Sequence, residues 1–134
     1  MSFLQVFVLL LMMSALVAAK EATIDKLRAK AVAGDIKAQV SIAARFDFGN
    51  GVRQDFAEAA KWYELAAKAG DAIAQNNLAN FFQEGLGVTK DYAKAFELFQ
   101  KSAEQGFANA QCSLGLMYDV GQSVPQNRAE ANTW

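Results

Sequence analysis

The sequence predicts an all-α protein, an α-solenoid of antiparallel helix pairs, and two repeated patterns carry this prediction. The pattern Gly-x-x-x-Ala-Gln occurs three times at a spacing of 36 residues, beginning at Gly34, Gly70 and Gly106. A Gly-x-Gly-Val segment, or a close variant of it, recurs at the same spacing and begins at Gly49, Gly85 and Gly121. A repeat of this length, in which glycines separate apolar stretches, is typical of stacked helical hairpins.

Each repeat unit contains two stretches with the apolar periodicity of a helix. In the central unit the apolar residues of the first stretch, from Ala74 to Phe82, recur at i, i+4, i+5 and i+8. The second stretch, shown by the first unit, also follows one helical face, with Ala59, Trp62, Tyr63, Ala66 and Ala67 at i, i+3, i+4, i+7 and i+8. Columns that keep their apolar character at the 36-residue shift are expected to form the core: Ile42/Leu78/Leu114, Ala43/Ala79/Gly115, Phe46/Phe82/Tyr118, Ala59/Ala95/Ala131 and Trp62/Leu98/Trp134.

The residues between these stretches have the chemistry of helix ends. Glycines such as Gly85 and Gly70 tolerate the positive φ that closes a helix, so they are expected to end the first and second helix of a unit, respectively. Asp55, Asp71 and Asp91 stand at expected helix starts. N-capping and the helix dipole account for these carboxylates better than catalysis does.

Composition narrows the possible functions. The 134 residues are 53% hydrophobic and 20% charged with a net charge of −1, which argues against disorder and against nucleic acid as a partner. The chain has no histidine and one cysteine, and it lacks the common nucleotide, zinc-protease and serine-hydrolase motifs. We therefore expect no catalytic residues, no metal site and no cofactor.

The N-terminal segment is expected to be a targeting sequence and not part of the folded domain. Residues 3–19 carry no charge, and Val17-Ala18-Ala19 supplies the small residues that signal peptidase requires. We expect a signal peptide over 1–19, cleavage after Ala19, and a secreted or periplasmic mature protein without a membrane segment. Because no basic residue precedes the apolar run, an uncleaved anchor is the alternative; a buried first helix is a further one.

The pattern from Ala74 to Gly106 resembles the Sel1-like repeat, a relative of the tetratricopeptide repeat. The resemblance divides the chain after the signal into a capping helix over 20–37, repeats over 38–73 and 74–109, and an incomplete repeat over 110–134. It implies a non-catalytic scaffold or adaptor that presents a concave helical groove to a protein or peptide. The alternative is a secreted enzyme acting on cell-wall or β-lactam substrates, as proposed for some relatives.

The same resemblance implies which residues line the groove. They lie on the first helix of each unit, in columns that vary from unit to unit, and the central unit has an amide-rich stripe there. The candidate binding residues are Asn76, Asn77, Asn80, Gln83, Glu84 and Cys112. An ordinary solvated face is the alternative for the stripe, and a partly buried, inert cysteine is the alternative for Cys112.

The third unit stops early. Ala129, Ala131 and Trp134 begin a second helix that has room for about two turns, whereas repeat arrays need a polar cap at each end. We therefore expect a fragment of a longer array. The alternatives are that Trp134 folds back on its own unit or that the apolar end is buried in a homodimer.

Overall fold

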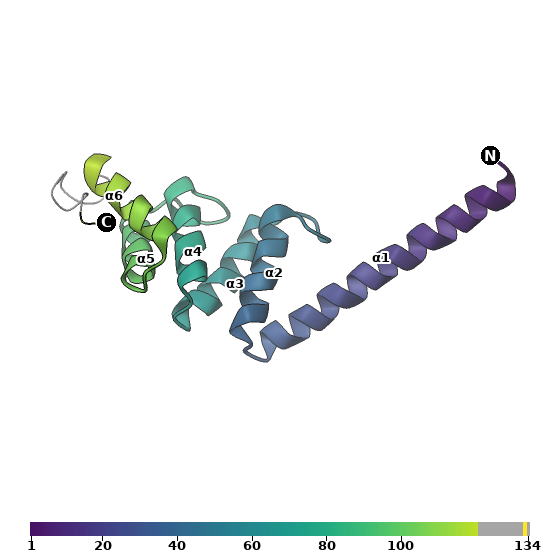
Figure 1. The fold of residues 1–134 in the computed structure, drawn as a ribbon, viewed down its shortest axis with the longest axis horizontal. Helices are drawn as coiled ribbons and strands as arrows, with labels where there is room; N and C mark the ends of the chain where they lie inside the picture. The colour runs from purple at the N-terminus through teal and green to yellow at the C-terminus, as the bar shows by residue number, and fades with distance from the viewer. Residues whose placement is uncertain (121–132, 134) are drawn as a thin grey trace.

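The computed structural model describes residues 1–120 and 133, and across these residues the chain is helical without any strand. Figure 1 shows a row of short helices with one long helix running away from it. The helices are α1 (Phe3–Val32), α2 (Ile36–Phe48), α3 (Phe56–Lys68), α4 (Ala72–Glu84), α5 (Tyr92–Glu104) and α6 (Ala108–Val120). The predicted all-α repeat architecture is confirmed. The predictions for Ala129, Ala131 and Trp134 lie outside the described residues.

Helix α1 joins the predicted signal segment and the predicted capping helix in one rod of 30 residues (Figure 1). An 18-residue window of it has a mean hydropathy of 2.1 and no buried residue, so by length and composition it could cross a membrane. Its last third contacts the repeats, because Ile24 and Ala31 are buried and Leu27 packs against the core. Only the part after residue 19 therefore contributes to the core.

The remaining helices form antiparallel pairs that stack in chain order. Helix α2 pairs with α3 and α4 pairs with α5, while α3 contacts α4 and α5 contacts α6 across the junctions between units. Helix α1 contacts α2 and so takes the place of the second helix of a preceding unit. We call α2, α4 and α6 the A helices, and α3 and α5 the B helices.

Aspartates cap four of these helices. The carboxylates of Asp35, Asp55, Asp71 and Asp91 accept the backbone N–H three residues further on, at 2.8–3.1 Å. Each cap stabilises its helix by about 1 kcal/mol. The capping role predicted for the last three is confirmed, which leaves no need for a catalytic interpretation.

The repeated Ala-Gln pair has a structural role. The side-chain amide N–H of Gln39, Gln75 and Gln111 donates to the carbonyl of Ala31, Ala67 and Ala103, respectively, at 3.1–3.2 Å. Each acceptor lies in the last turn of the preceding helix or, for Ala31, of α1. The glutamine thus ties the start of each A helix to the end of the helix before it.

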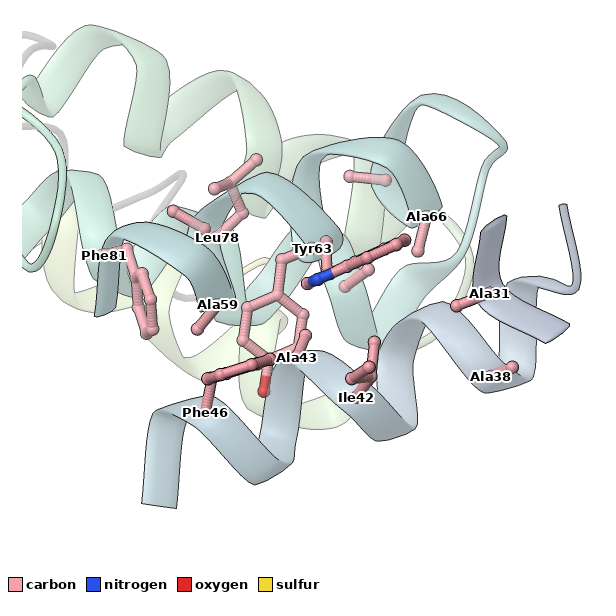
Figure 2. Packing of buried hydrophobic residues seen from close by; sticks show 14 residues of the cluster. Ala31, Ala38, Ile42, Ala43, Phe46, Ala59, Tyr63, Ala66, Leu78 and Phe81 are labelled. Atoms are coloured by element: carbon pink, nitrogen blue, oxygen red, sulfur yellow. The ribbon is translucent and has the colours of Figure 1, made fainter. Parts of the chain in front are cut away.

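Apolar side chains fill the space between the helices, as Figure 2 shows around Ile42, Tyr63 and Leu78. The predicted column Ile42/Leu78/Leu114 is buried throughout. The column Phe46/Phe82/Tyr118 is buried only at Phe46, and its other two members are half-buried.

The side chains one position earlier take the buried places in the second and third units. Phe81 is 3% exposed and Met117 is fully buried. The Phe81 ring packs edge-on against the rings of Phe56 and Tyr63, with centroids 5.8 and 5.6 Å apart. Phe81 is thus turned toward the preceding unit, where two aromatic rings are available to it.

Candidate functional site

The predicted groove residues share one face of α4, apart from Cys112 on α6, but they differ in exposure. Asn76 is 5% exposed, Asn77, Asn80 and Gln83 are half-buried, and Glu84 is exposed. Cys112 is exposed, so the alternative of a partly buried cysteine is wrong. The amide stripe therefore runs from the inside of the stack to its surface.

A hydrogen-bonded chain of side chains begins on α2 and reaches this stripe through α3. The Tyr63 hydroxyl donates to Oδ2 of Asp47 at 3.3 Å, and the Asn77 side chain lies close enough to the same hydroxyl to lower its pKa. The Asn76 amide then donates to Oδ1 of Asn77 at 3.3 Å. Four polar side chains from three helices thus follow one another through a largely apolar stack, and we call them the polar path.

The direction of every bond in this path follows from the carboxylate. Because Asp47 can only accept, Tyr63 donates to it, and the Tyr63 oxygen is left to accept from the Asn77 N–H. The Asn77 oxygen then faces Asn76, which must donate its own N–H. The path therefore ends on the Asn76 oxygen, which presents an acceptor and not a donor.

The Asn76 oxygen, Oδ1, is buried and has no hydrogen-bond partner among the described residues. Leaving such a group unpaired costs about 1–3 kcal/mol. A stable fold rarely keeps this cost without a ligand, a water molecule or a functional reason. The site is therefore built around one unused acceptor whose orientation is fixed from Asp47.

A second buried acceptor without a partner, Oε1 of Gln39, has a simpler explanation. The equivalent oxygen of Gln75 accepts from the side-chain N–H of Gln105 at 2.8 Å. A shift by 36 residues places Ala69 at the Gln105 position, so the donor is missing from the first unit. No substitution of this kind explains the unpaired oxygen of Asn76. The side chains before it in the path all have a partner, and only this last oxygen has none.

Burial changes the ionisation of the two groups at the start of the path. Burial raises the pKa of Asp47 above its usual value, and the hydrogen bond from Tyr63 offsets part of this increase. Burial, together with the nearby Asp47 charge, raises the pKa of Tyr63 to about 12. The tyrosine hydroxyl thus stays protonated and remains a donor over the whole neutral range.

The sequence placed Tyr63 on the apolar face of a helix and gave no reason to connect it with Asp47. The available signal was the column Leu27/Tyr63/Phe99, in which only one member carries a hydroxyl. At the next junction Phe99 has no oxygen with which to continue such a path. The path is thus specific to the junction between the first two units.

The part of the chain that the structure describes holds no group of three or more Cys, Asp or Glu side chains that could bind a metal ion. The geometry offers hydrogen bonds and apolar contact, which is the chemistry of recognition. The fold defines a helical-repeat protein of the α-solenoid class.

The chain belongs to the Sel1 repeat family, whose model matches residues 36–71, 72–107 and 108–134. Members of this family are typically protein–protein interaction scaffolds. The matched units have the same 36-residue period as the predicted ones and begin two residues earlier. No curated protein matches the chain.

Two solved structures are similar over most of the chain. One is a protective antigen present in uropathogenic Escherichia coli strains that displays an SLR fold, with 37% identity and a TM-score of 0.80. The match covers 82% of this chain and only 24% of the antigen, so the chain spans about a quarter of that protein. The other is a Sel1 repeat protein from Oxalobacter formigenes, with 34% identity, a TM-score of 0.74 and 84% coverage of both chains.

Proposed function

We propose that the chain is an exported, non-catalytic scaffold that binds an extended segment of a partner protein along its A helices. The observation that carries this proposal is the buried, unpaired Asn76 oxygen at the end of the path from Asp47. Because this oxygen is covered in the free chain, a partner segment must displace the side chains that cover it, and the N–H donor that it then accepts is one that every peptide backbone supplies.

Neighbouring residues extend the same surface. Asn80 and Gln83 follow Asn76 at i+4 and i+7 on α4, within reach of successive backbone groups of an extended chain. Phe48, which is 77% exposed at the end of α2, offers an apolar contact next to Asp47. Amides for the backbone and an aromatic ring for a side chain are a common combination in peptide recognition.

We expect Asn76→Val to weaken peptide binding and to stabilise the fold. The change has a precedent within the chain, because Val40 occupies the same column of the first unit. Removing the unpaired oxygen relieves its cost, whereas the half-buried Asn77 oxygen loses the Asn76 N–H and must turn to water, so stability should rise by at most about 1 kcal/mol, while loss of the acceptor should reduce affinity about tenfold. Peptides selected from a random phage library on the full chain serve as ligands for titration calorimetry, and thermal unfolding measures stability.

Asn109→Ile is the matched control. It also replaces an asparagine by an apolar residue with a precedent in its column, Ile73, but it lies on the exposed start of α6. We expect this variant to bind the selected peptides like the wild type. A loss of affinity in a more stable Asn76→Val protein cannot result from unfolding, whereas unchanged affinity would refute binding at Asn76.

We infer export because the two parts of α1 differ in their contacts with the repeats. Residues 3–19 contribute no buried side chain, whereas Ile24, Leu27 and Ala31 contact the repeats. Cleavage after Ala19 would therefore leave the capping contacts on the mature chain. N-terminal sequencing of the protein from its native cell envelope should give Lys20 as the first residue, and a chain that still begins at Met1 would contradict cleavage.

The enzyme alternative requires an activated hydroxyl near a carboxylate, and Asp47 with Tyr63 is such a pair. Tyr63, however, is fully buried, and its pKa is raised to about 12, so its hydroxyl is a weaker nucleophile than that of a free tyrosine. The pair orients the amide path and supplies no group for acyl transfer. Interaction is thus the function that this geometry supports best.

A further inference from the structure

A second candidate site lies between the two B helices, away from the amide path. It is a cleft of about 250 Å³ lined by residues of α3, α4 and α5. Its apolar walls are formed by Ala67, Leu78, Phe82 and Leu98. Leu98 and Phe82 are half-buried, so the cleft opens to solvent instead of being sealed in the core.

The repeat shows which side chains fill the equivalent position one unit earlier. That position, the first junction, lies between α1, α2 and α3, and the cleft lies at the second junction, between α3, α4 and α5. A shift by 36 residues converts the four apolar wall residues into Ala31, Ile42, Phe46 and Trp62. These four residues belong to one buried cluster in which Trp62 is only 9% exposed, and Figure 2 shows the first three spread along it, with Ile42 between Ala31 and Phe46. At the second junction the smaller Leu98 replaces the indole. The cleft is therefore the counterpart of a place that an indole ring occupies one unit earlier.

The first junction and the cleft carry side chains of opposite charge at equivalent positions. At the first junction the Trp62 indole N–H donates to Glu58 at 3.1 Å, and the Arg28 guanidinium lies over the Phe46 ring at 5.6 Å. At the cleft the Glu58 column carries Lys94, whose ammonium lies over the Phe82 ring at 5.2 Å. The cleft thus has the ammonium of Lys94 at the position where the first junction has the carboxylate of Glu58.

The rim of the cleft favours a negative ligand group. It carries Lys68, Lys94 and Lys101 against two glutamates. Lys68 pairs with Glu64 at 3.1 Å, whereas Lys94 and Lys101 form no ion pair among the described residues. Two ammonium groups are thus available to a carboxylate held at the mouth of the cleft.

We propose that this cleft binds an indole side chain that lies next to a carboxylate in a segment of a partner protein. The partner's ring fills the space that Leu98 leaves open where the first unit has Trp62, and it packs near Phe82. The partner's carboxylate pairs with Lys94 and Lys101. This site is separate from the Asn76 site, so the scaffold would hold partners on both sides of the stack.

N-acetyl-L-tryptophan is a probe that combines both groups, and N-acetyl-L-tryptophanamide keeps the ring without the charge. Titration of each into the full, isotope-labelled chain is followed by NMR. We expect both probes to shift the signals of Leu78, Phe82 and Leu98, and the acid to bind about fivefold more tightly than the amide because of the two ammonium groups. Equal binding of the two probes, or shifts confined to other residues, would overturn the proposal.

Leu98→Trp tests the origin of the cleft, because it restores the residue of the Trp62 column. We expect a folded protein that binds the acid at least about tenfold more weakly. Leu65→Trp is the matched control: it adds the same ring at a leucine of α3 that is 49% exposed and does not line the cleft, and it should leave probe binding unchanged. Undiminished probe binding by a folded Leu98→Trp protein would refute the site.

If Leu98→Trp does not fold, Lys94→Glu provides the test, since Glu58 is its precedent. It should remove the preference for the acid and retain binding of the amide. A second copy of the chain is the competing occupant: concentration-dependent self-association that Leu98→Trp abolishes would also overturn the proposal. Asn76→Val should leave probe binding unchanged, so failure at one site is distinguishable from failure at the other.

Discussion

Gly87→Ala is expected to destabilise the repeat domain by about 2–5 kcal/mol. Gly87 has a φ of +64°, where an L side chain costs about 1–2 kcal/mol. A Cβ added there would lie 2.3 Å from the Phe56 carbonyl carbon and 2.4 Å from the Ala57 nitrogen. Both atoms belong to the first turn of α3, which cannot move without disturbing the Asp55 cap, so overpacking adds about 1–3 kcal/mol.

Gly51→Ala is the control that separates these two contributions. Gly51 occupies the same column one unit earlier and has a similar φ of +75°, but an added Cβ would come no closer than 3.4 Å to the end of the Arg45 side chain. We therefore expect the backbone strain alone, about 1–2 kcal/mol. Thermal unfolding of both variants measures the difference, at roughly 4–8 °C per kcal/mol for a domain of this size. Equal losses would show that the loop does not approach α3 so closely.

The sequence was sufficient for the features that depend on neighbouring residues. Asp55 and Asp91 could be assigned as caps because a cap needs only the following turn, and Gly85 could be assigned as a helix end because positive φ is a local property. The 36-residue repeat then implied that the units stack. Local chemistry and the period together were enough to predict the α-solenoid.

Features that depend on contacts between units were not predictable in this way. The Asp47–Tyr63–Asn77 path joins residues of three helices, and its partners are 16 residues apart in one of its bonds. The close approach of Gly87 to Phe56 likewise connects the loop of one unit to the start of the preceding B helix. A periodic pattern identifies the face of a helix, but not which atoms meet across the junction.

Departures from the repeat proved more informative about function than the repeat itself. Tyr63 gives way to Phe99 at the next junction, which confines the polar path to one place. Trp62 gives way to Leu98, which opens the cleft between the B helices. In a repeat protein, each unit supplies a reference for the next, so such a substitution can be interpreted without any related sequence.

Phe81→Ala is expected to lower the unfolding free energy by about 3–5 kcal/mol, the usual cost of removing a buried phenylalanine ring. Phe81 is 3% exposed and packs edge-on against both Phe56 and Tyr63, so its removal leaves a cavity between the first two units. The Tyr63 ring, held on its other side by the hydrogen bond to Asp47, cannot move in to fill that cavity without giving up the bond.

Phe82→Ala should cost only about 1 kcal/mol, because its ring is half-buried and one of its contacts is the exposed Lys94. The two variants remove the same side chain from adjacent positions of α4, so differences in helix propensity and side-chain entropy cancel between them. Chemical denaturation should therefore give a lower midpoint for Phe81→Ala at a similar slope. If Phe82→Ala proved the more damaging, the periodicity that placed Phe82 in the core would be correct, and the packing of Phe81 between the units would be wrong.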